Sequence, residues 1–456
     1  MKKRILAAFL VAAMSLSLTA CGSSSTPASS KKAESDQSES KSETNEPVKH
    51  KDIIVWTLAD DLKTFAERYT EQTGNNVETV VIAPADYPTK LTAALSARSD
   101  TPDVVVGEPQ MLTDFFDAGF FSDLSTYISE DDAKAKIVDY IVDAGKDTDG
   151  VLRALSYQIT PGSIIYRRDL AKEVWGTDSP EDLAKKFQDF ATITKSAEEV
   201  RAKGYHLFAS TADIGRYSGG NEPWVKDGKL IMSDDRMAYF DTAVALFQKE
   251  LIAFAPEWSA AWYASMAGEL PFKAEWTAAE ELASIGGDKT QVLAYSLPTW
   301  GALIVRDNAK DNIGNFGVTT GPGAYFGGGT FLGISEFSAK KDAAWAFVEY
   351  VTLNEETSQW WIEASNGDVV SMKSVLEANK DYTNPSFGDQ KTYAFYLDAA
   401  KDIDFSLITK YDTQIGNAFG QAISAVQTGD KTKDQALSDF YTEVAAVYPE
   451  LTLPVS

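Results

Sequence analysis

Short apolar runs alternate with amphipathic segments near the start of the globular part of this chain, and this alternation most limits its fold. Residues 53–56, 77–82 and 102–107 are rich in valine and isoleucine, which is typical of strands buried on both faces. The apolar residues of segments 62–69 and 87–99 recur at helical spacing. Strands and helices in this order predict βαβ units and a parallel sheet, so we expect an α/β fold.

Polar residues follow two of these strands directly. Asp60 and Asp61 come after the first strand, and Glu108 and Gln110 come after the third. Ligands of open α/β sheets bind beyond the carboxyl ends of the strands, so these four side chains are candidate ligand contacts. The alternative for the two aspartates is that they cap the helix that begins at Leu62.

The composition narrows the function classes. The formal net charge is −25, and the first 20 residues carry three basic and no acidic residues, so the remainder is near −28. Such a surface argues against a nucleic-acid partner, which needs a basic footprint. The chain has only two histidines, His50 and His206, so it offers almost no candidates for a histidine triad or a multi-histidine metal site. We therefore expect no metal, no cofactor and no catalytic residues. Abundant carboxylates leave a two-carboxylate glycosidase as an open alternative.

The N-terminus has the features of an export signal. Three basic residues at positions 2–4 precede an apolar run over 5–18, which is short for a membrane span. The run ends in Leu18-Thr19-Ala20-Cys21, and Cys21 is the only cysteine of the chain. This pattern resembles the lipobox of bacterial lipoproteins, so we expect residues 1–20 to be a signal peptide and Cys21 to be lipidated. A plain secretory signal is the alternative.

The segment after the cysteine differs from the rest of the chain. Residues 21–51 contain mainly Ser, Lys, Glu, Thr and Pro and almost nothing apolar, which predicts a disordered tether. The folded part then begins near residue 52 and spans about 400 residues, more than one core usually holds, so two lobes are expected.

Two later segments predict bends or crossings of the chain. Pro161-Gly162 interrupts a strand-like run over 157–170, and Gly327 to Gly329 precede another strand. The glycines supply hinge torsions or let the backbone approach a ligand, and an ordinary loop is the alternative. Many aromatic residues lie between these segments, each either core or ligand contact: Tyr217, Trp224, Trp258, Trp262, Tyr263, Trp276 and Trp300.

Several motifs, in this order and behind a lipobox, resemble the extracellular solute-binding proteins of family 1, which are sugar receptors of ABC importers. Arg167 and Arg168 stand where the family has Asn-Lys before Asp-Leu, and Gly416-Asn417 stand where a family relative has an aromatic residue. The matching segments are 101–105, 119–124, 157–170, 327–338 and 343–347.

The resemblance implies a two-lobed fold of the periplasmic-binding-protein type, hinge-linked, with the ligand in the interlobe cleft. It places residues 52–160 and 330–370 in the N-terminal lobe, and 161–329 and 371–456 in the C-terminal lobe. It also implies a monomeric receptor, not an enzyme, which is lipid-anchored at the outer face of the cytoplasmic membrane. This receptor is expected to bind a carbohydrate, in particular an oligosaccharide, and to deliver it to the transmembrane subunits of an ABC permease. The alternatives are a membrane-tethered carbohydrate-active enzyme and a receptor for a non-sugar solute.

By position, the resemblance assigns ligand contacts to three groups of residues. These groups are polar residues of the first lobe, residues of the crossing, and residues of the second lobe and hinge. In that order they are Asp60, Asp61, Glu108 and Gln110; Tyr157, Gln158 and Thr160; and Trp276, Trp300, Gly328 and Gly329. The missing aromatic near Gly416 means that a maltodextrin is not implied.

Overall fold

The computed structural model describes residues 53–83, 86–219, 222–269, 291–407 and 409–454. The strands are β1 (Ile53–Thr57), β2 (Val77–Val81), β3 (Val104–Gly107), β4 (Ala154–Ser156), β5 (Gly162–Arg167), β6 (His206–Phe208), β7 (Val225–Lys226), β8 (Lys229–Leu230), β9 (Val292–Pro298), β10 (Phe316–Thr319) and β11 (Phe331–Ile334). Trp276 lies outside the described residues, as do the expected signal peptide, Cys21 and the tether.

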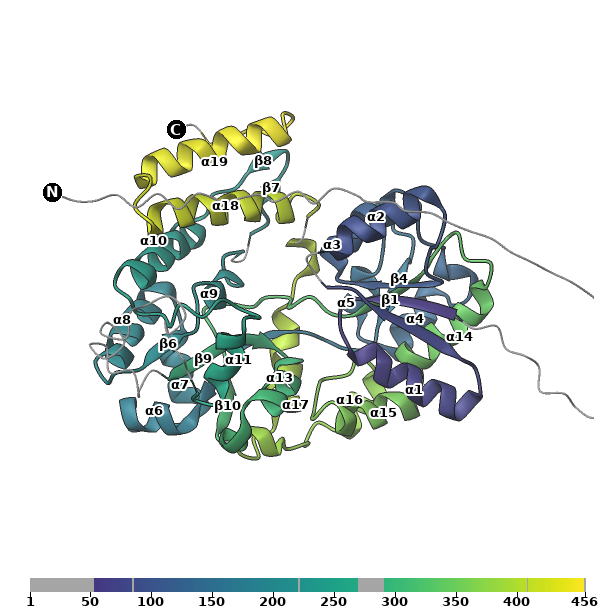
Figure 1. The fold of residues 1–456 in the computed structure, drawn as a ribbon, viewed down its shortest axis with the longest axis horizontal. Coiled ribbons are helices and arrows are strands. Elements are labelled where there is room, and N and C mark those ends of the chain that lie inside the picture. Colours follow the sequence, from purple (N-terminus) through teal and green to yellow (C-terminus); the bar gives the residue numbers. More distant parts are fainter. Residues whose placement is uncertain (1–52, 84–85, 220–221, 270–290, 408, 455–456) are drawn as a thin grey trace, which may run out of the picture. The chain divides into compact units, whose positions relative to one another are not determined.

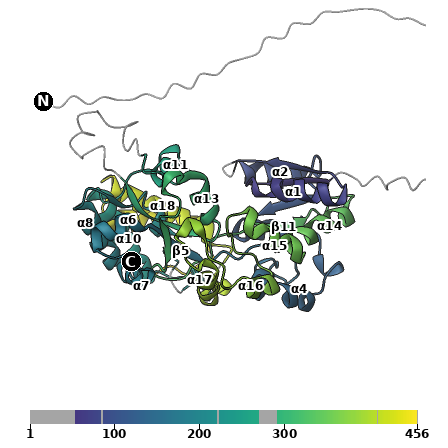
Figure 2. The same ribbon diagram turned by 90° about the horizontal axis from the view of Figure 1, so that it is seen from below.

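The helices fall into two groups, which Figures 1 and 2 both show apart. One group lies around the sheet that contains β1: α1 (Asp61–Thr73), α2 (Tyr87–Ala97), α3 (Pro109–Asp117), α4 (Glu130–Lys136), α5 (Asp139–Ala144), α14 (Lys341–Thr352), α15 (Glu355–Ala364) and α16 (Lys373–Ala378). The other lies around β5 and β9: α6 (Arg168–Trp175), α7 (Pro180–Phe187), α8 (Phe190–Arg201), α9 (Ala212–Gly215), α10 (Asp234–Gln248), α11 (Ala260–Met266), α13 (Gly301–Asn308), α17 (Thr392–Ala399), α18 (Asp412–Gln427) and α19 (Lys433–Val447).

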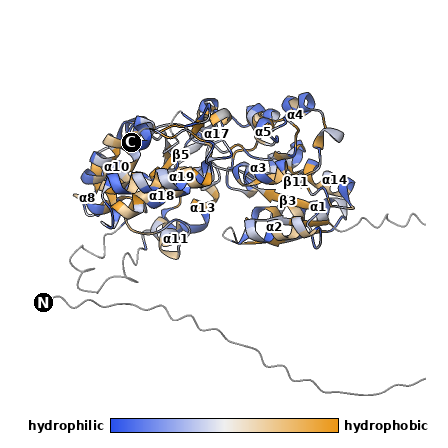
Figure 3. Cartoon of the chain, turned by 90° about the horizontal axis from the view of Figure 1, so that it is seen from above, coloured by the Kyte–Doolittle hydropathy of each residue, from blue (hydrophilic) through white to orange (hydrophobic). Residues whose placement is uncertain are grey.

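The first sheet has five strands in the order β2-β1-β3-β11-β4. β1 is parallel to β2 and β3, as the βαβ pattern predicts, whereas β11 runs antiparallel between β3 and β4. All four residues of β3 are buried, which explains its unbroken apolar sequence. In Figure 3 the strands near β3 and β11 are coloured as hydrophobic, which matches their place inside the molecule.

Helix α1 shows how the sequence pattern produces this packing. Its buried residues are Leu62, Phe65, Ala66 and Tyr69, which form one apolar stripe. Burial of such large side chains stabilises the fold by about 1.5–3 kcal/mol each. The helix ends at Gly74, whose φ of 73° suits glycine and whose N–H donates to the carbonyl of Thr70.

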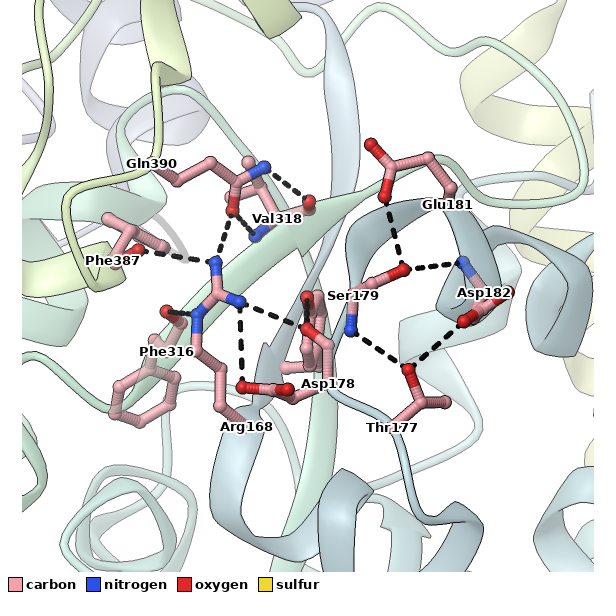
Figure 4. Close-up of polar contacts among 11 residues, drawn as sticks. Arg168, Thr177, Asp178, Ser179, Glu181, Asp182, Phe316, Val318, Phe387 and Gln390 are labelled. Carbon is pink, nitrogen blue, oxygen red and sulfur yellow. Dashed lines mark hydrogen bonds and ion pairs between the residues drawn. The ribbon is translucent and has the colours of Figure 1, made fainter.

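The second sheet has four strands in the order β10-β5-β9-β6, so β10 is an edge strand. The side chain of Gln390 covers this edge, because its amide accepts from the N–H of Val318 (2.9 Å) and donates to the carbonyl of Val318 (2.9 Å). Arg168 in turn donates to Gln390 Oε1 (2.9 Å) and to the carbonyls of Phe316 (2.8 Å) and Asp178 (3.0 Å), as Figure 4 shows. This arginine, an unusual residue in the family motif, therefore ties three segments together.

Three segments meet where the chain passes between the two sheets, and they hydrogen-bond to one another. The carbonyl of Thr160 accepts from the N–H of Gly327 (2.8 Å), which joins the first crossing to the second. The N–H of Ile159 donates to the carbonyl of Val369 (2.9 Å), which joins the first crossing to the segment before α16. The chain thus passes between the sheets near residues 160 and 328, and residue 369 lies beside the first of these passages, whereas the following helix α16 still lies in the first group. The exact lobe boundaries stay a prediction.

The hydrophobic residues form two large clusters. One is centred on the first sheet and includes Phe65 and Trp361, and the other contains α8, α10, α18 and α19, with Phe240, Phe419 and Phe440 in contact. Among the described residues, no helix has the length and apolarity needed to cross a membrane.

Candidate functional site

Asp60 and Asp61 lie at the carboxyl end of β1, as predicted, but in different surroundings. Asp60 is exposed and pairs with Lys63 (2.5 Å). Asp61 is the first residue of α1, and its carboxylate accepts from the N–H of Leu62 (2.9 Å) and from the hydroxyl of Tyr157. Burial raises the pKa of Asp61. Asp60 makes no capping bond to the helix, so the capping role is limited to the contact between Asp61 and Leu62.

Glu108 occupies the corresponding position after β3, immediately before α3. Its side chain keeps contact with solvent, yet the protein around it raises its pKa by desolvation, and Arg216 opposes that rise. Within the described residues its carboxylate has no hydrogen bond or ion pair. A Cβ atom added to Gly328 would come within 2.8 Å of this carboxylate, so the carboxylate lies against the backbone of the second crossing.

The glycines of this crossing have a geometric reason to be glycine. Gly328 and Gly329 have φ values of 78° and 114°, a region that other residues rarely adopt. The buried hydroxyl of Thr160 donates to the carbonyl of Gly328 (3.1 Å). Four predicted site residues, Glu108, Thr160, Gly328 and Gly329, therefore lie together.

Tyr157 and Gln158 are interior residues in this structure. The ring of Tyr157 packs between Phe65 (ring centroids 4.8 Å apart) and Trp361 (5.6 Å). Gln158 pairs with Val370 of the segment before α16, and its buried Oε1 has no hydrogen-bond partner in the described part of the chain. Both residues support the crossing and the position of Asp61, and a direct ligand contact stays a prediction for them.

An exposed aromatic pair lies beside this crossing. The rings of Trp258 and Trp300, which we name the aromatic shelf, are 5.6 Å apart with an interplanar angle of 32°. Trp258 is 48% exposed, although large aromatic residues usually bury most of their surface. The indole N–H of Trp300 donates to the carbonyl of Gly327 (3.1 Å), which fixes the shelf to the second crossing.

Arg216 and Glu257 form an ion pair next to the shelf. The guanidinium carbon of Arg216 lies 5.9 Å from the centre of the Trp300 ring. Burial raises the pKa of nearby Asp213 to about 7, and the negative charge of Glu257 adds to this rise. Arg216 and Glu257 therefore place one positive and one negative group beside Trp300, where they can donate to or accept from hydroxyl groups.

Sequence reasoning missed Arg216, Glu257 and Asp213 as site residues, and it left Trp258 undecided. One signal was available, because Asp213 and Arg216 follow β6 just as Asp60 and Asp61 follow β1, so the same rule about strand ends applies to the second sheet. No sequence signal reports the exposure of Trp258.

Gln110 lies in α3 and lines a cavity of about 160 Å³ together with Arg216. Its Oε1 is buried and has no hydrogen-bond partner within the described ranges. Among the described residues, no group of three or more His, Cys, Asp and Glu side chains is arranged to hold a metal ion.

The chain matches one protein family over most of its length. The family described as bacterial extracellular solute-binding protein matches residues 64–387. Comparison with curated proteins gives no significant match.

Solved structures with the same fold include several sugar-bound receptors. An ABC-transporter-associated binding protein from B. animalis subsp. lactis, in complex with beta-1,6-galactobiose, has a TM-score of 0.71 and 19% identity, covering 89% of this chain and 100% of its own. The GacH receptor of Streptomyces glaucescens, solved unliganded and with acarbose, has a TM-score of 0.66 and 18% identity, covering 88% and 99%. The lacto-N-biose-binding protein of an ABC transporter from Bifidobacterium longum has a TM-score of 0.65 and 14% identity, covering 90% and 100%.

The two-lobed α/β fold expected from the sequence is thus confirmed, and at these identities the structural likeness concerns the fold alone. The family match covers more than half of the chain. The chain therefore belongs to the bacterial extracellular solute-binding proteins.

Proposed function

We propose that this protein is the carbohydrate receptor of an ABC importer and that it binds its ligand on the aromatic shelf. The observation that carries this proposal is Trp258, which is half-exposed, lies across Trp300 and is flanked by the Arg216–Glu257 pair. An exposed indole ring packs well on the apolar C–H face of a sugar, and charged groups at its edge bind the hydroxyls.

The two crossings give the same site a second wall. Glu108 has a carboxylate without a partner among the described residues, and it lies against Gly328. A carboxylate accepts strongly from hydroxyl groups because charge-assisted hydrogen bonds are stronger than neutral ones. We infer that Glu108 binds the sugar from the side opposite to the shelf, and that Asp60, Asp61 and Gln110 extend this polar wall.

The relatives agree with a sugar ligand. Proteins of the same fold are solved with beta-1,6-galactobiose, acarbose and lacto-N-biose, and the family consists of binding proteins rather than enzymes. We therefore propose binding without hydrolysis, followed by closure of the lobes about the crossings and delivery to the permease. A ligand that contacts both lobes gains contacts only in the closed form, so it shifts the population toward closure.

A thermal-shift screen tests the binding proposal. We expect one or more of a panel of neutral mono- and oligosaccharides to raise the melting temperature, since a ligand that binds only the folded state stabilises it. Trp258→Ala is expected to lower the affinity by about 1–3 kcal/mol. Trp345→Ala is the matched control, because Trp345 is half-buried and stacks on Tyr127 (5.0 Å, 11°) in the first lobe. The proposal fails if no carbohydrate shifts the transition, or if both variants lose affinity equally.

Membrane anchoring is a separate proposal, and it rests on the lipobox-like sequence at Cys21 and the polar segment that follows. A thioether-linked diacylglycerol supplies two acyl chains, which suffices for stable anchoring. Cys21→Ser should release the protein into the medium or leave its precursor uncleaved. Fractionation and maturation identical to those of the wild type would contradict the anchor.

A further inference from the structure

A polar cavity adjoins the aromatic shelf on the other side of Arg216. Its volume is about 160 Å³, far above the roughly 10–15 Å³ that one water molecule needs. Gln110 contributes from α3, and Arg216, Trp224, Ala324 and Asp402 contribute from the other lobe. The cavity is therefore large enough for several hydroxyl groups or the waters that they displace.

Arg216 is a shared wall of the shelf and the cavity. Its guanidinium group lies 5.9 Å from the ring centre of Trp300, and the same residue lines the cavity. The shelf and the cavity therefore share this arginine, so a ligand that lies on the shelf beside Arg216 is within reach of the cavity.

The polar groups of the cavity differ in how fully they are bonded. Arg236 is completely buried and donates to four carbonyls, those of residues 219, 222, 223 and 231, while its guanidinium carbon lies 4.1 Å from the centre of the Trp224 ring. Gln110 Oε1 and Arg216 Nε have no hydrogen-bond partner among the residues described, and neither has Arg236 Nε, although the other two nitrogens of Arg236 are bonded. Buried polar atoms without partners are costly, so Gln110 and Arg216 have bonding capacity to offer after a small rotation.

The charge of the cavity limits what can enter it. Four carboxylates line it, and only the two guanidinium groups of Arg216 and Arg236 oppose them. The carboxylates are Glu222, Asp402, Asp404 and Asp412. These carboxylates repel a negatively charged ligand, so they disfavour the carboxylate of a uronic acid. Hydroxyl groups of a neutral sugar, in contrast, donate readily to them.

We propose that this cavity is a second subsite, which takes an uncharged sugar unit, so that the ligand of this receptor is a neutral oligosaccharide of at least two rings that passes across Arg216. This proposal rests on the proposed function, because it needs one sugar ring on the aromatic shelf. It adds the minimum size and the charge of the ligand.

Isothermal titration of the full chain with a panel of glycans tests the second subsite. The probes are glucose, galactose, maltose, beta-1,6-galactobiose, lacto-N-biose, the matching trisaccharides and digalacturonic acid. We expect the best neutral disaccharide or trisaccharide to bind at least about tenfold more tightly than either monosaccharide, and digalacturonic acid to bind more weakly than the neutral disaccharides.

Two variants test whether the preference for oligosaccharides arises in the cavity. Ala324→Leu fills the cavity, and Asp402→Ala removes an exposed carboxylate from it, so that at least one variant keeps the fold. Both should lower oligosaccharide affinity toward the monosaccharide level and leave monosaccharide binding unchanged. Ala184→Leu is the matched control, since Ala184 is half-buried elsewhere on the second lobe and should have no effect.

The outcomes separate the two proposals. Monosaccharides that bind as tightly as oligosaccharides, a preference for digalacturonic acid, or cavity variants that keep the oligosaccharide preference would each overturn the second subsite and leave the carbohydrate receptor standing. Absence of binding for every glycan of the panel would overturn both.

Discussion

Arg168 and Arg216 are arginines of the same lobe with similar burial but different surroundings. The side chain of Arg168 is 18% exposed and that of Arg216 is 24% exposed. Every guanidinium nitrogen of Arg168 donates to a partner from its own region, whereas Arg216 has one carboxylate partner and an Nε without any in the described structure. The exposed fraction of the side chain therefore does not distinguish these two arginines, but their hydrogen bonds do.

The largest expected effect tests the structural member of this pair. Arg168→Ala removes charged hydrogen bonds to Phe316, Asp178 and Gln390, so we expect a loss of about 2–4 kcal/mol in the free energy of unfolding. Denaturant titration measures it, and carbohydrate affinity of the folded fraction should not change. A loss below about 0.5 kcal/mol would show that water replaces these bonds without cost.

The functional member should respond in the opposite way. Arg216→Gln keeps a donor but removes the charge beside Trp300 and Glu108, so we expect carbohydrate affinity to fall about 10–100-fold while stability changes by about 1 kcal/mol or less. Calorimetric titration and denaturant titration on the same variant separate the two effects. The distinction between the two arginines would be wrong if Arg216→Gln lowered the free energy of unfolding as much as Arg168→Ala does.

Gly328 offers a smaller and more local test. Gly328→Ala costs about 1–2 kcal/mol because of its φ of 78°, and its Cβ must also displace the carboxylate of Glu108. Gly150→Ala is the matched control, since Gly150 has a φ of 81° and open space around its Cβ position. Both variants should lose similar stability, but only Gly328→Ala should change carbohydrate affinity. Equal affinities would place Glu108 outside the binding site.

The remaining test concerns the pH dependence of stability and needs no ligand. Burial raises the pKa of Asp213 and of Asp368 to about 7, above the value near 3.9 of an unfolded chain. The folded state holds these protons more tightly, so their contribution to stability is full below pH 4 and is lost as pH rises to about 7. The slope is at most about 1.4 kcal/mol per pH unit for each group. Asp213→Asn should reduce the slope of the free energy of unfolding against pH. An unchanged slope between pH 5 and 7 would contradict the raised pKa of Asp213.

The sequence was informative where one element determines its own structure. The apolar stripe of α1 and the buried run of β3 have local periods, and both elements lie close to the predicted residues. The positions of Asp60, Asp61, Glu108 and Gln110 at strand ends followed from the same pattern. These features needed no knowledge of distant contacts.

Contacts between distant segments were not predictable in this way. The ring of Trp258 lies against Trp300, which is far along the chain. Arg216 acts electrostatically on Glu108, which belongs to the other lobe. No local pattern reports such pairs, so the aromatic shelf could be found only from the structure.

The position of β11 has a consequence for the order in which the two sheets of this chain are completed. β11 runs between β3 and β4 and supplies hydrogen bonds to both, yet it is synthesised long after them. Val105 of β3 and Ala154 of β4 therefore lack the strand between them until Gly333 has been translated. Pairings between such distant segments form slowly. The first sheet is thus completed only after every strand of the second sheet has been synthesised.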